Sequence, residues 1–161
     1  MIRVDPITAE VVRCGLVTIA NEMGDTMIRT ARTPTFSESH DFSTSIFDCQ
    51  GRIVALADAL PIHMGACKFS VQAVLDAFGD DIHPGDLFLV NDPYHGGSHL
   101  PDWTMTAPVF FDGELVFFPV TRAHQGDTGG AVPGGYNPGA TDIWQEGLRL
   151  PPIRIFDRGR P

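Results

Sequence analysis

The first 33 residues contain few of the residues that interrupt regular structure, and this constrains the fold more than any other feature. They hold two of the 17 glycines and one of the 13 prolines. Asp5-Pro6 is typical of a helix start, with Asp5 as N-cap and Pro6 at the first helical position. Apolar residues then recur at helical spacing: Ile7, Val11, Val12, Leu16, Ile19, Met23, Met27 and Ile28. We expect one long amphipathic helix that packs on a core and ends by about Arg32, before Thr33-Pro34.

Two β-hairpins follow from the pattern of β-rich segments and turn residues. A hairpin is expected wherever two such segments flank a short turn. The segments are 42–47 and 52–56 around the turn at 48–51, and 103–111 and 115–121 around Asp112-Gly113. A second helix over about 66–78 and a short strand at 87–90 lie between the hairpins. The second half of the chain is rich in loops, and the whole pattern predicts an α+β domain.

Composition limits the class of protein. A length of 161 residues predicts a single domain over 1–161, and 43% apolar residues predict a globular one. The net charge of −9 argues against a nucleic-acid or anionic-membrane surface. No apolar run approaches the roughly 18 residues of a membrane-spanning helix, and no signal peptide is evident. Three cysteines without a CxxC pair indicate reduced thiols. We therefore expect a cytoplasmic protein.

Histidine and aspartate recur together in three stretches: FSESHDFS, GGSHLPDW and TRAHQGDTGG. In the second, Pro101 disfavours a helix, and a tight turn there would bring His99 and Asp102 to one centre. His124 and Asp127 flank Gly126 in a similar way. Two imidazoles with one or two carboxylates suit a divalent ion such as Mn, Fe or Zn. The spacing alone leaves two interpretations open, a metal site or polar loops bonded to their own backbone.

Other motifs of catalysis are absent from the sequence. There is no phosphate-binding loop of the GxxxxGK[ST] type and no GxSxG nucleophile elbow. We interpret His63 as a helix-capping histidine or a buried, hydrogen-bonded one, and Cys67 as a small buried side chain.

Four motifs, in this order, resemble the N-terminal part of the hydantoinase B/oxoprolinase family: RTARTPTFSESHDFSTSIFDCQGRIVA, NDPYHGGSHLPDWTMTAPVF, TRAHQGDTGG and IWQEGLRLPP. The resemblance runs from about Thr8 to Arg154. It implies a fragment of a larger fold, because family chains are several times longer. It also implies a subunit of an ATP-dependent N-methylhydantoinase or 5-oxoprolinase, or of the related acetone and acetophenone carboxylases. A hydantoinase A-like partner would bind and use ATP with Mg in a hetero-oligomer that acts on a small molecule.

The resemblance also implies site residues. In the carboxylase relatives one glutamate, two histidines and one aspartate hold a divalent metal, and the matching residues here are Glu38, His99, Asp102 and His124. Independently of the resemblance, we expect Asp127 or His95, which stand near these residues in the sequence, to assist as general base. Gln125 stands where many members have a second histidine. A catalytically silent module that docks a partner subunit is the alternative from another class.

Overall fold

The computed structural model describes residues 4–57 and 60–161. The helices and strands, in chain order, are α1 (Pro6–Thr30), α2 (Pro34–Ser37), β1 (Phe42–Asp48), β2 (Ile53–Leu56), α3 (Pro61–Phe78), β3 (Leu87–Val90), η1 (Pro93–His95), β4 (Asp102–Thr106), β5 (Val109–Phe111), β6 (Glu114–His124), η2 (Pro133–Gly135), η3 (Ile143–Gln145) and β7 (Ile153–Phe156).

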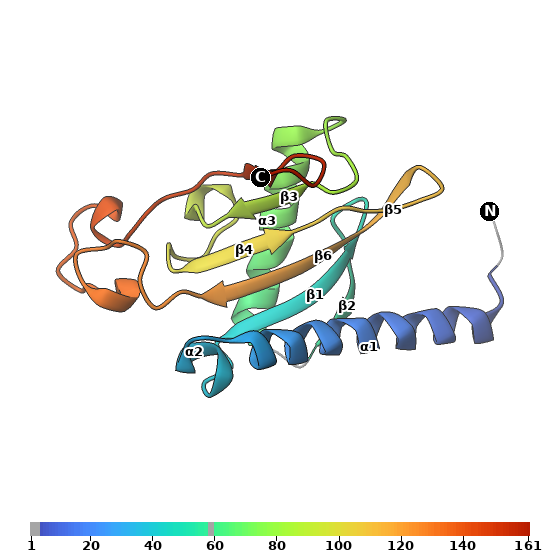
Figure 1. Cartoon of the computed structure of the whole chain (residues 1–161), viewed down its shortest axis with the longest axis horizontal. Coiled ribbons are helices and arrows are strands. Elements are labelled where there is room, and N and C mark those ends of the chain that lie inside the picture. Colours follow the sequence, from blue (N-terminus) through green and yellow to red (C-terminus); the bar gives the residue numbers. More distant parts are fainter. Residues whose placement is uncertain (1–3, 58–59) are drawn as a thin grey trace.

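The strands form one antiparallel sheet, in which β6 is the central element (Figure 1). The order is β2-β1-β6-β4-β3-β7, and β5 pairs with the first part of β6. β6 is the longest strand because it pairs with β1 along one side and with β5 and then β4 along the other. The α+β architecture, the long N-terminal helix and the two hairpins predicted from the sequence are confirmed.

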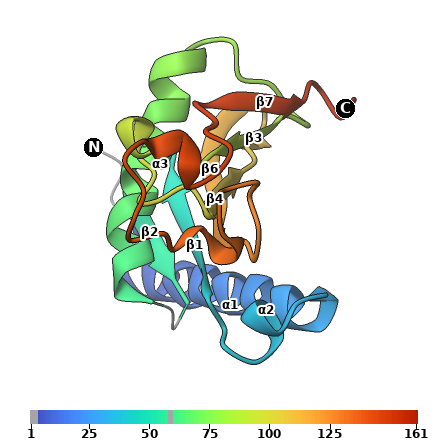
Figure 2. The ribbon, with the colours of Figure 1, turned by 90° about the vertical axis from the view of Figure 1, so that its left-hand side faces the viewer.

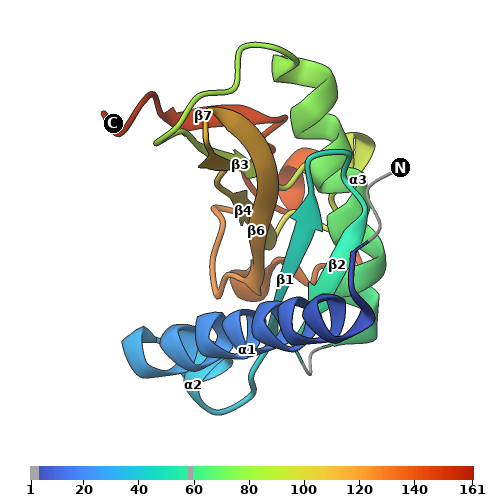
Figure 3. The ribbon, with the colours of Figure 1, turned by 90° about the vertical axis from the view of Figure 1, so that its right-hand side faces the viewer.

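The two long helices pack on opposite faces of β1. Alternate residues of a strand point to opposite faces, so Ile46 lies against Ala20 of α1, while Phe47 lies in the cluster that contains Val71 of α3. Figure 3 shows β1 and β2 between the two helices. Because β1 is covered on both sides, six consecutive residues from Phe42 onward are buried.

α1 packs on the sheet only from Leu16 onward, so the expectation of a helix that packs on a core is wrong for its first ten residues. Ala20 is fully buried, and its carbonyl accepts a hydrogen bond from Thr44 Oγ1 at 2.8 Å. By contrast, Ile7 is 75% exposed and Val11 66% exposed. The reason is the position of the helix, whose first turns extend beyond the ends of β1 and β2 (Figure 1). Amphipathic spacing indicates a helix, but it does not say whether a neighbour is there to cover it.

Several elements differ from the sequence prediction at their ends. α3 begins at Pro61 rather than near residue 66, and a proline is well suited to the first turn of a helix. The predicted strand 103–111 is divided into β4 and β5 around Ala107-Pro108, since proline cannot donate to the ladder. α2 and β7 are short elements that the sequence pattern did not predict. None of the helices in the described residues has the length and apolarity needed to cross a bilayer.

Candidate metal centre

Three side chains converge at the end of the sheet where β6 finishes and β4 begins. His99, Asp102 and His124 each place one ligand atom within 4.8 Å of the others, and the described residues contain no other such group of three. Nδ1 of His99 lies 2.9 Å from Oδ2 of Asp102, and Nδ1 of His124 lies 3.2 Å from Oδ1. The two imidazole rings are 5.1 Å apart between centroids. Figure 2 views the sheet from this end.

Strand register brings two of these residues together. Asp102 opens β4 and is the direct cross-strand partner of His124, which ends β6. Cross-strand partners lie on the same face, which here is the face that α3 covers. Further along that face of β6 come the fully buried Phe118 and Val120, which belong to the core against α3. The side chains on this face of β6 are therefore polar at the end of the strand, where the site lies, and apolar further back, where they belong to the hydrophobic core.

A turn before β4 supplies the third residue, as the sequence predicted. The Asp102 amide donates to the His99 carbonyl at 3.0 Å, and this closes the turn around Pro101. The preceding glycines make room for the chain, because a Cβ on Gly97 would collide with the backbone of Asn91 and Asp92. The loop thus folds back on itself and presents His99 beside Asp102.

Asp102 is the electrostatic centre of the group. Burial by itself raises the pKa of this carboxyl, but hydrogen bonds from His99 and Ser98 outweigh burial and hold its pKa well below the ordinary value. The bond to Asp102 raises the pKa of His99. Asp102 is therefore anionic at neutral pH, which is the state a metal ligand needs, while a metal ion has to compete with a proton for His99.

His63 is a fourth group at the site that sequence reasoning did not assign to it. It lies in the first turn of α3, it is 4% exposed, and its Nε2 is 3.5 Å from Oδ2 of Asp102. The Nδ1 atom is buried and has no hydrogen-bond partner within the described part of the chain. Burial lowers the pKa of His63 despite the nearby carboxylates. His63 is buried, as expected, but the hydrogen bond expected for its ring is not found at Nδ1 among the described residues. Its position beside Asp102 was not predicted from the sequence.

A pocket of about 400 Å³ opens over the group. Its lining residues are Asp41, Leu60, His63, Ser98, His99, Asp102 and His124. Two imidazoles and a carboxylate at one end of a small pocket match the ligands that first-row divalent ions prefer, so the residues present fit such an ion. The remaining volume leaves room for water or a small organic molecule.

Two carboxylates precede β1, and the structure places them differently. Asp41 lines the pocket, its Oδ1 lies 3.7 Å from Nε2 of His63, and its carbonyl accepts a hydrogen bond from the His124 amide at 3.0 Å. Glu38 lies at the end of α2, is exposed, and is not among the residues that line the pocket. The signal for Asp41 was present in the sequence, since it follows His40 and stands one residue before the strand.

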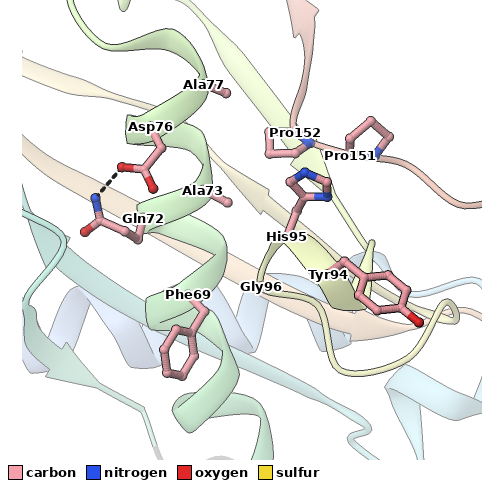
Figure 4. A pocket seen from close by; sticks show the side chains of 10 residues that line it. All are labelled: Phe69, Gln72, Ala73, Asp76, Ala77, Tyr94, His95, Gly96, Pro151 and Pro152. Atoms are coloured by element: carbon pink, nitrogen blue, oxygen red, sulfur yellow. Dashed lines mark hydrogen bonds between the residues drawn. The ribbon is translucent and has the colours of Figure 1, made fainter.

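The two residues expected to assist as general base lie outside this pocket lining. Asp127 is exposed and accepts a hydrogen bond from the Gly129 amide at 2.8 Å, within its own turn. His95 faces a second pocket, of about 530 Å³, between α3 and Pro151-Pro152 (Figure 4). Its Nδ1 lies 2.7 Å from Oδ2 of the buried Asp92. Thus the two histidines of the segment NDPYHGGSHLPD line different pockets: His95 lines the second pocket and His99 lines the pocket over the candidate metal centre.

Comparison with protein families gives a match to the model described as hydantoinase B/oxoprolinase, over residues 5–161. Among curated proteins, the beta subunit of the caprolactamase of Pseudomonas jessenii is 43% identical over 157 residues, which is 98% of this chain and 27% of that protein. The 5-oxoprolinase 1 of Arabidopsis thaliana is 39% identical over 141 residues, which is 88% of this chain and 11% of that protein. The chain thus spans about a quarter or less of these relatives.

Solved structures agree with the sequence matches. The ATP-dependent caprolactamase from Pseudomonas jessenii superposes with a TM-score of 0.90 at 43% identity, over 99% of this chain and 28% of that one. A nucleotide-free structure of acetone carboxylase superposes with a TM-score of 0.84 at 21% identity, over 96% of this chain and 21% of that one. At that identity the second likeness shows the fold alone.

Proposed function

Because the chain belongs to the hydantoinase B/oxoprolinase family, we propose that it is the metal-binding part of a subunit of an ATP-dependent amidohydrolase. The substrate class is cyclic amides such as N-methylhydantoin or 5-oxoproline. The convergence of His99, Asp102 and His124 on one pocket carries this proposal. The names of the matched relatives, a caprolactamase and a 5-oxoprolinase, support a cyclic amide as substrate.

The chain would work in a hetero-oligomer with a hydantoinase A-like subunit that binds ATP and Mg. The partner would use ATP to activate the amide oxygen of the substrate, which fits the absence of a phosphate-binding loop from this sequence. Two relatives from Pseudomonas are named as single subunits, one of a caprolactamase and one of a D-/L-hydantoinase, which supports a division of labour between chains.

His99, Asp102 and His124 would hold a divalent ion, with Mn, Fe and Zn as the candidates. A fourth ligand would come from the segment before β1, either Glu38, which the family resemblance indicates, or Asp41, which lines the pocket. When bound, the ion would supply a Lewis acid for an amide oxygen or for water.

Other roles at the site would fall to side chains of this chain: orienting the imidazoles, lining the pocket and acting as general base. Asp102 lies within hydrogen-bonding distance of both imidazoles, and it would hold the two rings near one centre until an ion replaces the shared protons. Leu60 would give the pocket an apolar wall beside the polar group. The candidates for the general base are Asp127 and His95 from the sequence, together with Asp41 and His63 from the pocket lining.

Metal content of the 161-residue chain tests the proposal. After purification and loading with Zn²⁺, elemental analysis of the wild-type chain should give about one ion per chain. We expect His99→Ala and His124→Ala to lose the ion, while the control His95→Ala keeps it, because His95 faces the other pocket. Full occupancy in His99→Ala would refute the assignment.

Two other functions are separated by an assay with an ATP-using hydantoinase A-type partner. ADP release that depends on 5-oxoproline or N-methylhydantoin supports the amidohydrolase. Release that depends on acetone and bicarbonate supports a ketone carboxylase, for which the likeness to acetone carboxylase provides the fold. A chain without metal that gives no ATP turnover with either substrate would be a silent interaction module.

A further inference from the structure

Arg122 is a buried arginine without a carboxylate partner among the described residues. It lies on β6 two residues before His124, on the same face of the strand, and it is fully buried. Unlike Arg149 and Arg154, it makes no ion pair with a carboxylate in the described parts of the chain. Burying a cation is costly unless hydrogen bonds or a counter-charge compensate it. The hydrogen bonds of this guanidinium therefore have to offset the cost of its burial.

Its hydrogen bonds join three separate parts of the fold. Nε donates to Thr104 Oγ1 on β4 at 2.7 Å. Nη2 donates to Ser70 Oγ on α3 at 2.8 Å and to the Gly96 carbonyl at 3.0 Å. Ser70 Oγ donates to the same carbonyl at 2.7 Å. One planar cation thereby connects the sheet, the helix above it and the loop between β3 and β4.

That loop carries two of the proposed metal ligands. Gly96 precedes His99 by three residues, and it packs so closely on α3 that a Cβ there would overlap the backbone of Phe69 and Ser70. In the sheet, the pair Thr104–Arg122 is the next pair of the same face after Asp102–His124. Arg122 is thus the neighbour of His124 on the same face of β6, and it donates a hydrogen bond to the loop that carries His99.

From these contacts we infer that Arg122 is a positioning residue of the metal centre. By holding the Gly96 carbonyl and Ser70 together, it fixes the loop from Asn91 to Asp102 on α3, and so sets His99 and Asp102 relative to His124. The inference rests on the proposed metal site, and it adds a residue that does not touch the ion. Groups that orient metal ligands change affinity by about 10- to 100-fold when they are removed.

Three variants separate position from charge. Arg122→Met removes the cation at similar size, and Arg122→Lys keeps the charge but lacks the planar fork needed to reach the three acceptors at once. Ser70→Ala removes one acceptor with no change of charge. Arg154→Met, at the β7 edge, is the matched control, since it removes a partly buried arginine far from the site in the sheet order.

The measurements are the affinity of the whole chain for Zn²⁺ by competition with a chelator, the visible d–d spectrum with Co²⁺ in place of zinc, and amide exchange of residues 91–102 without metal. We expect Arg122→Met and Arg122→Lys to bind Zn²⁺ about 10- to 100-fold more weakly, with an altered Co²⁺ spectrum and faster exchange in this loop. Arg154→Met should lose stability without these changes. If Arg122→Met does not fold, the same three measurements on Arg122→Lys and Ser70→Ala test the inference.

The outcomes distinguish this inference from the proposed function. A wild-type chain that binds neither Zn²⁺ nor Co²⁺ would refute the metal centre itself, and the role in positioning its ligands with it. A wild-type chain that binds metal, together with Arg122 and Ser70 variants of unchanged affinity, spectrum and exchange, would refute the role of Arg122 alone.

Discussion

At the scale of the residue, Asp92 shows how one carboxylate organises a loop. It is fully buried, accepts a hydrogen bond from the Tyr94 amide at 3.0 Å, and lies 2.8 Å from Nε of Arg149. Burial alone raises the pKa of this carboxyl, but the bonds from Tyr94, His95 and Arg149 outweigh burial and hold the pKa below its ordinary value of 3.8. Its charge is therefore a stabilising feature of the folded chain.

We expect Asp92→Asn to lower the free energy of unfolding by about 2–4 kcal/mol at neutral pH. The pKa of Asp92 is lower in the folded chain than in the unfolded one. Its contribution is therefore complete above the unfolded value of about 4 and disappears as the pH falls through the folded value. Urea unfolding should show a steeper loss for the wild type than for the variant below about pH 4. Asp76→Asn, at an exposed site, is the control, and identical slopes for wild type and Asp92→Asn would contradict the expectation.

A second pair of substitutions tests which carboxylate is the fourth ligand of the proposed metal site. We expect Asp41→Asn to weaken Zn²⁺ binding by at least about tenfold and Glu38→Gln to have a smaller effect, because Asp41 lines the pocket and Glu38 does not. Chelator competition measures both affinities. A larger loss in Glu38→Gln would instead support the assignment from the family resemblance and would require α2 to move toward the site.

At the scale of the element, the sheet aligns the site through its register. β1 pairs with β6 so that Phe42 lies opposite Ala123, and β4 pairs with β6 so that Asp102 lies opposite His124. Asp41, one residue before β1, therefore comes beside the same end of β6. Because side chains alternate along a strand, a shift of one residue in either pairing would turn a ligand to the other face.

The contact between the loop and α3 gives a prediction at this scale. Gly96 has a φ of +87° and no room for a side chain, so Gly96→Ala should cost about 2 kcal/mol or more and weaken Zn²⁺ binding as well. Gly126→Ala is the control, since no atom lies within 4 Å of a Cβ there, and should change stability by less than about 0.5 kcal/mol. Thermal unfolding and chelator competition measure the two effects. A stable, metal-binding Gly96→Ala chain would show that the loop tolerates displacement from α3.

At the scale of the whole molecule, the proposed metal site would couple the binding of an ion to folding. Its residues come from four segments: the residue before β1, the start of α3, the turn that leads into β4, and the end of β6. An ion that binds only the folded chain should stabilise it by about 2.7 kcal/mol at a concentration 100 times its dissociation constant. Zn²⁺ should therefore raise the unfolding midpoint, a chelator should reverse the shift, and His99→Ala should abolish it. An equal shift in His99→Ala would place the ion elsewhere.

Local patterns in the sequence determined the elements and part of the site. The spacing of apolar residues, the Asp5-Pro6 start and the Asp112-Gly113 turn depend on neighbours within a few residues, so the long helix and the hairpins could be predicted. The turn at Pro101 is equally local, and it brings His99 and Asp102 together as expected. The pairing of these residues with His124 followed from the family resemblance rather than from spacing.

Only the tertiary structure decided what depends on contacts between distant segments. Which face of α1 is covered, how His63 reaches Asp102, and how Arg122 reaches Gly96 all depend on the order and register of strands far apart in the chain. The same holds for the separation of His95 from His99 into two pockets. The sequence by itself determines the helices, the turns and the types of residue available to bind a metal. The placement of these candidate residues on one face of the sheet follows from long-range pairing, which no local pattern encodes.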